Sequence, residues 1–253
     1  MITRRFIENL KQQHWTGVVI ELVIVVLGVF IGLQANNWNE RREFRQREIG
    51  LLKDLRADIV AENKLLRSRG DEYREVSAAG QRALAALDDG TGCKDHCVAV
   101  IVDLMHASQW VSARLSQSTF QEMRRLGLPR AYSVSSAVGA YYSQNMSMSD
   151  GLDDKPAYRT LVRGLVPLSV QTAYWNHCYA MQGGIETLKL NCPLGISNEQ
   201  AARIVAAVAA NPQIVPTLTE WTGFLTPVPR MLEDDVSAGE RAIAAIDQEL
   251  AGR

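Results

Sequence analysis

A near-continuous apolar run at residues 17–33, GVVIELVIVVLGVFIGL, is the strongest hydrophobic pattern in the chain. Its seventeen residues span about 25 Å as a helix, and Trp15 and Trp38, which bracket the run, lie about 35 Å apart along a continuous helix. That separation suits two interfacial aromatic belts. A cleaved signal peptide is the main alternative, but Leu33 is too bulky for the position two residues before Ala35. The pattern therefore predicts a transmembrane helix over residues 17–38, preceded by a short amphipathic tail over residues 1–16.

One face of the predicted span differs from the others. Gly17, Glu21, Gly28 and Gly32 recur at four- or seven-residue spacing and so share a face, which Asn36 continues. Gly28 and Gly32 form a small-xxx-small motif, which lets two helix backbones approach closely in lipid. We therefore expect a homo-oligomer with these five residues at the helix–helix interface.

Glu21 places an acid inside the apolar run, at a cost of about 2.5–3.5 kcal/mol at mid-helix and less near a helix end. Two arrangements suit it. In the first, Glu21 lies near the headgroups, either snorkelling or paired with Lys11 or His14. In the second, a ring of Glu21 side chains lies at a helix–helix interface, protonated or lining a polar path.

After the membrane segment, apolar residues fall at helical intervals among charged ones without a proline or turn signal. This pattern predicts one long helix from the membrane to about Leu87, with a bend near Gly70. Shorter helices are expected at residues 98–106, 116–127 and 134–148. A further helix is expected from Asp153 to about Leu190, with a kink at Pro167.

The sequence also predicts helices in the last third of the chain. Ser197 and Gln200 form a capping box for a helix at residues 201–210, and TPVPR at 226–230 interrupts a final helical region that ends near Leu250. We find no strand-like alternation of useful length. The expected fold is all-α: one N-terminal transmembrane helix continuing into an antiparallel extramembrane helical bundle over residues 39–253.

The formal net charge of −1 over 253 residues gives no global basic field, so nucleic acid is not an expected partner. The expected partners are the lipid bilayer, other copies of the chain and another membrane or periplasmic protein.

A count of Lys and Arg beside the span favours a cytoplasmic location for the part of the chain that follows the span. Against that count, large domains can cross despite flanking charge, the short tail has few acids, and the cysteines suit an oxidising compartment. We therefore predict a bacterial inner-membrane protein with a cytoplasmic N-terminus and a periplasmic domain.

The four cysteines fall into two local pairs, Cys93/Cys97 and Cys178/Cys192, as expected of disulfides in an oxidising compartment. Four cysteines allow three connectivities, and the sequence does not choose among them. A Cys/His metal site that includes His96 is a second option, but the spacing in CKDHC is not Cys-x2-Cys. Free thiols are a third. We expect disulfides and no metal site.

Catalytic signatures are missing from the sequence, which has no GxSxG, GxxxxGK[ST], HExxH or Rossmann pattern. Five aromatic residues could line a ligand pocket between helices, although aromatics at helical spacing are more often core: Tyr141, Tyr142, Tyr174, Trp175 and Tyr179. We expect a protein that is not an enzyme and has no cofactor.

Four segments together resemble a known family: LQANNWNERR (33–42), LLKDLRADI (51–59), STFQEMRRLG (118–127) and AYY (140–142). They are similar to bacterial single-pass membrane proteins of a domain-of-unknown-function family with an LQxNNWNE juxtamembrane motif. Met123 stands where that family usually has Leu. The resemblance covers about residues 17–145, and it implies the architecture without supplying an activity or a catalytic residue.

Taken together, these patterns predict a membrane-anchored homo-oligomer whose periplasmic helical domain binds a partner or ligand, in a sensory or scaffold role. The alternative is an ion-conducting assembly with Glu21 at the helix–helix interface.

Overall fold

The computed structural model describes the backbone of residues 15–88, 93–183 and 185–252, with side chains from residue 20 onward. Residues 1–14 of the predicted amphipathic tail therefore lie outside the described residues. Two compact units divide the chain, Met1–Leu51 and Leu52–Arg253. In chain order the elements are α2 (Trp15–Asp88), η1 (Lys94–His96), α3 (Cys97–Ala107), α4 (Ser118–Arg125), α5 (Tyr132–Leu152), α6 (Ala157–Leu165), α7 (Leu168–His177), β1 (Tyr179–Gln182), β2 (Ile185–Leu188), α8 (Asn198–Ala209), α9 (Ile214–Leu225) and α10 (Val228–Ala251).

The long N-terminal helix is confirmed. α2 ends at Asp88, one residue beyond the predicted end, and it continues through Gly70 without interruption. Its N-terminal part is long and apolar enough to cross a membrane, and none of that apolar window is buried in the protein. The large apolar side chains from Ile20 to Leu33 are about half exposed or more. Burial in a protein core therefore does not account for this apolar stretch.

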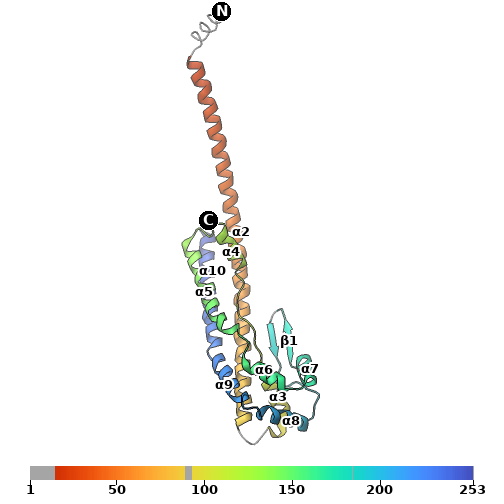
Figure 1. Cartoon of the computed structure of the whole chain (residues 1–253). Coiled ribbons are helices and arrows are strands. Elements are labelled where there is room, and N and C mark those ends of the chain that lie inside the picture. The colour runs from red at the N-terminus through yellow and green to blue at the C-terminus, as the bar shows by residue number, and fades with distance from the viewer. Residues whose placement is uncertain (1–14, 89–92, 184, 253) are drawn as a thin grey trace, which may run out of the picture. The chain divides into compact units, whose positions relative to one another are not determined.

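The second unit contains a helical bundle made by the C-terminal half of α2 with α5 and α10 (Figure 1). Leu52, Leu55, Ile59 and Leu66 of α2 are fully buried, at the helical intervals that the sequence predicted. α10 runs antiparallel to α2, as three exposed ion pairs show: Arg56 with Asp247, Arg67 with Glu240 and Arg74 with Glu233. Exposed pairs of this kind add little stability, so their value here is that they report the helix register. The all-α class is confirmed, with one small hairpin added.

The predicted helix from Asp153 to Leu190 is wrong. α6 ends at Leu165, Val166 is extended with ψ 126°, and α7 begins after Pro167. A residue before proline is pushed away from helical angles, and proline lacks the amide hydrogen that a helix interior needs, so the chain breaks here instead of bending.

The sequence reading also missed a β-hairpin, since it found no strand. β1 and β2 pair antiparallel, with Tyr179 opposite Leu188 and Gln182 opposite Ile185. Gly183 has a φ of +59°, and a second glycine follows it in the sequence. Two glycines between short runs are a hairpin-turn signal, because such turns need positive φ angles.

α3, α6, α7 and α8 lie near the hairpin, where α3 packs against α8, and α6 packs against α9 (Figure 1). α8 begins with the predicted capping box. The Gln200 amide donates to Ser197 Oγ at 3.2 Å, and the Ser197 amide donates to Gln200 Oε1 at 3.0 Å. The final helical region breaks between α9 and α10 at Thr226 and Pro227, within the predicted interruption.

Candidate functional site

The predicted interface face lies on α2. Glu21, Gly28, Gly32 and Asn36 are all exposed, and Gly17 belongs to the same helix. A Cβ atom placed at Gly28 or Gly32 would have no heavy atom within 4 Å apart from the neighbouring backbone of its own helix. Asn36 Nδ2 donates to Glu40 Oε1 at 2.7 Å, one helical turn further on. The face is therefore open to a second helix, and the packing of a partner on it stays a prediction.

All four cysteines form disulfides. Cys93 is bonded to Cys97, with their Cα atoms 4.7 Å apart, and Cys178 is bonded to Cys192, with a Cα separation of 5.2 Å. The local pairing is therefore the connectivity that forms, and neither the metal site at CKDHC nor free thiols describe these residues. Within the described part of the chain, no group of three or more His, Cys, Asp or Glu side chains could hold a metal ion.

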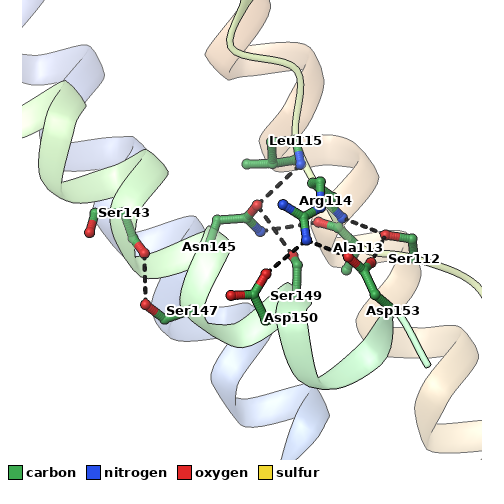
Figure 2. A network of polar contacts seen from close by, with 10 residues as sticks. All are labelled: Ser112, Ala113, Arg114, Leu115, Ser143, Asn145, Ser147, Ser149, Asp150 and Asp153. Carbon is green, nitrogen blue, oxygen red and sulfur yellow. Dashed lines mark hydrogen bonds and ion pairs between the residues drawn. The ribbon is translucent and has the colours of Figure 1, made fainter.

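A buried amide connects three segments of the bundle, as Figure 2 shows in part. Asn145 of α5 accepts from the Leu115 amide at 3.1 Å and donates to the Ala113 carbonyl at 3.1 Å. Its Nδ2 also donates to Asp235 of α10 at 3.0 Å, and the neighbouring Gln144 donates to the same carboxylate at 2.8 Å. Burial raises the pKa of Asp235, while the two amide donors oppose this effect. Asn145 thus fixes the extended segment before α4 to both helices.

A surface ion-pair cluster borders this amide. Arg114 pairs with Asp150 at 2.8 Å and also with Asp153, which accepts from the Ser112 hydroxyl at 3.0 Å (Figure 2). Each acid is matched by the arginine, so the cluster holds the extended segment against the end of α5 and offers no unpaired acid pair for hydrolysis.

A second acid, Glu62 of α2, is half-buried and faces α5. The Tyr142 hydroxyl donates to Glu62 Oε2 at 3.2 Å, and the Thr119 hydroxyl donates to the neighbouring Asp58 at 2.6 Å. Burial is the main cause that raises the pKa of Glu62 to about 7. Tyr141 and Tyr142 are buried beside it, so these two aromatics belong to the core.

The carboxyl group with the most strongly raised pKa lies where the hairpin meets α2. Arg69 and Glu72 of α2 face Glu186 of β2, and we name these three residues the hairpin charge cluster. Arg69 Nη1 lies 2.7 Å from Glu72 Oε2 and 3.7 Å from Glu186 Oε1, and the three side chains are 10%, 2% and 8% exposed. Burial, followed by the contact with Glu186, raises the pKa of Glu72 to about 8.

The aromatic residues near the hairpin are also structural. Tyr174 is fully buried and its hydroxyl accepts from Gln109 at 2.8 Å. Trp175 packs edge-to-face on Tyr179 with ring centroids 4.8 Å apart, and the Arg163 guanidinium lies 4.8 Å from the centre of the Trp175 ring. These contacts hold α7 against β1.

An open cleft of about 300 Å³ lies between the end of α5 and α9. Trp221 and Phe224 give it a stacked aromatic wall, and Lys155, Asp154 and Glu220 supply its charges. The residues that line it also include the hydroxyl side chain of Thr217, but no His, Cys or Ser.

Sequence reasoning missed the buried polar groups. A signal was present, because Asn63 and Arg69 occupy core positions in the helical series that runs through Ile59, Leu66 and Tyr73. Their partners on α10 and β2 are far away in sequence, so the pattern alone could not name them.

Comparison with protein-family models, with curated proteins and with solved structures gives no match. The resemblance drawn from the LQxNNWNE motif therefore stays a prediction.

Proposed function

We propose that the chain is a single-pass protein of the bacterial inner membrane, with its span at residues 17–38 and its N-terminus in the cytoplasm. The helical domain after the span faces the periplasm and binds a partner or ligand in a sensory or scaffold role. The observation that carries the proposal is the exposure of the whole apolar stretch from Ile20 to Leu33, because so large an apolar surface needs lipid or another helix to cover it.

Two further observations support the compartment and the assembly. Disulfides form and persist in oxidising compartments, so the Cys93–Cys97 and Cys178–Cys192 bonds favour the periplasm. The open face at Gly28 and Gly32 favours a homo-oligomer, since small residues permit close helix contact.

Cysteine cross-linking within the span tests the assembly. Every native cysteine is already in a disulfide, so one new cysteine reports on its own position. We expect Gly28→Cys and Gly32→Cys to form disulfide-linked dimers in native membranes under mild oxidation. Val23→Cys and Phe30→Cys, on the opposite side of the helix, should not. Equal cross-linking at all four positions, or none at any, would contradict a specific interface.

Ion conduction is the second candidate, and it rests on one observation: Glu21 is an exposed acid within the apolar stretch, on the same face as the two glycines. Under this alternative, Glu21→Gln abolishes ion flux into vesicles while the Gly32→Cys cross-link still forms. Unchanged flux in that variant removes conduction from consideration.

A further inference from the structure

The hairpin β1–β2 is held against α2 through the hairpin charge cluster. Two carboxylates, Glu72 and Glu186, share one guanidinium, that of Arg69, and all three side chains are at least nine-tenths buried. Glu72 Oε1 and Arg69 Nε are buried without a hydrogen-bond partner. With both acids ionised, these three side chains carry a net charge of −1 in the protein interior, which is costly.

Titratable side chains of α2, α6, α7 and β1 surround the hairpin charge cluster. Tyr73 of α2 donates its hydroxyl to the Val111 carbonyl. Arg159 of α6 attracts Glu186 while its Nη1 donates to the Ser108 carbonyl at 2.6 Å, so its charge partly balances Glu186 and leaves the shared proton with Glu72. Tyr179 of β1 and Tyr174 of α7 also face Glu186 and are neutral at ordinary pH, because the pKa of each is raised.

We propose that Glu72 and Glu186 form a proton-sensitive switch, in which one shared proton keeps the hairpin docked on α2 and its loss releases the hairpin. The switch lies wholly within the helical domain, so it goes beyond the proposed membrane role and does not depend on it. In the docked state the protonated carboxyl donates to the other carboxylate, and Arg69 balances the remaining charge. Loss of the proton places two like charges face to face.

The covalent structure limits how far the hairpin can move. The Cys178–Cys192 disulfide closes the base of the hairpin, and the Lys189 amide donates to the Cys178 carbonyl at 2.9 Å. Release therefore swings residues 179–191 as a closed loop and separates Tyr179 from Trp175. It also uncovers the α2 surface at Arg69 and Glu72, which becomes a pH-dependent binding face.

Proton linkage gives the direction in which docking of the hairpin changes with pH. The docked state holds its proton more tightly than a free carboxyl group does, because the pKa of Glu72 is raised. Docking is therefore strongest below the ordinary pKa of a carboxyl group and weakens as the pH rises through about 8. Between these two values the ratio of released to docked hairpin rises about tenfold per pH unit, as expected for one proton, and it levels off above about 8 because both states are then deprotonated.

Amide hydrogen exchange on the full chain in lipid nanodiscs tests the switch, with rates corrected for the intrinsic effect of pH. Between about pH 6 and about pH 9 we expect the amides of residues 179–191 to lose protection, while those of α5 keep theirs. Glu186→Gln keeps a hydrogen-bonding side chain but removes one charge, so the hairpin should stay protected across the range. Glu72→Gln should do the same, which gives a second variant if one fails to fold.

Glu199→Gln is the matched control, because Glu199 is exposed and pairs with Arg203 on the surface of α8. It should reproduce the wild-type pH profile. The switch is overturned if wild-type protection of the hairpin does not change with pH. It is equally overturned if Glu186→Gln and Glu72→Gln lose protection over the same range as the wild type.

Discussion

Gly239 of α10 lies where α10 meets α2, and replacing it with alanine tests the packing of the bundle. A Cβ atom at this position would lie 2.3 Å from Asn63 Oδ1 and 2.8 Å from its Cγ, far inside van der Waals contact. Asn63 is buried, donates to the Val236 carbonyl at 3.3 Å and accepts from the Tyr141 hydroxyl at 3.3 Å. A methyl group therefore forces Asn63 out of both hydrogen bonds.

Three contributions set how much Gly239→Ala changes the free energy of unfolding. Overpacking a tight core site costs about 1–3 kcal/mol. The two hydrogen bonds that Asn63 loses add about 1–3 kcal/mol, because its amide remains buried. Alanine is the better helix former by about 1 kcal/mol, which offsets part of the loss. We therefore expect Gly239→Ala to lower the free energy of unfolding of the helical domain by about 1–5 kcal/mol.

Urea unfolding of the full chain in detergent, followed by near-ultraviolet circular dichroism, measures this change. Gly139→Ala is the matched control, because Gly139 also lies within a helix, α5, but a Cβ placed there has no heavy atom within 4 Å apart from the neighbouring backbone of that helix. The control should be stabilised by about 0.5–1 kcal/mol. If both variants change stability alike, the close approach of α10 to α2 at Asn63 is refuted.

Three further predictions concern the buried polar groups and the second disulfide. Since the pKa of Glu62 is raised to about 7, its contribution to stability is full below the ordinary carboxyl pKa and is lost as the pH rises through 7. Glu62→Gln should flatten that loss in denaturation curves and stabilise the domain by about 1–3 kcal/mol at pH 8, after a discount for partial exposure. Asn145→Ala leaves the Leu115 amide without its buried acceptor and removes one of the two amide donors to the Asp235 carboxylate, so it should cost about 2–3 kcal/mol in the same assay. Replacing Cys178 and Cys192 together with alanine opens a loop of about 15 residues and should cost about 3 kcal/mol, read from the unfolding midpoint at pH 6.

The features that the sequence predicted correctly are those set by neighbours along the chain. The apolar run at residues 17–33 and the helical spacing after it predicted α2 almost to its end, because a helix with no proline and a periodic apolar face has no competing structure. The capping box at Ser197 and Gln200 was also predicted, since both halves of that interaction lie within one turn.

The features that the sequence did not predict depend on contacts between distant residues. β1 and β2 have only four residues each, too few for a clear alternation, and the helical composition around them hid the two-glycine turn. Glu72 and Glu186 come together only after the hairpin docks on α2, so neither residue stood out along the chain. Which cysteines pair also depends on which residues meet in the folded chain, because four cysteines allow three connectivities.

The central claim is that residues 17–38 remain in the membrane and hold a disulfide-bonded domain in the periplasm. Protease treatment of a C-terminal tag in intact spheroplasts, run beside reducing and non-reducing gels, tests it most directly. The account predicts that the tag is cleaved from outside, that the membrane keeps an N-terminal fragment, and that reduction shifts the mobility of the intact chain. A protected tag together with no shift on reduction would contradict it, and would place the helical domain in the cytoplasm.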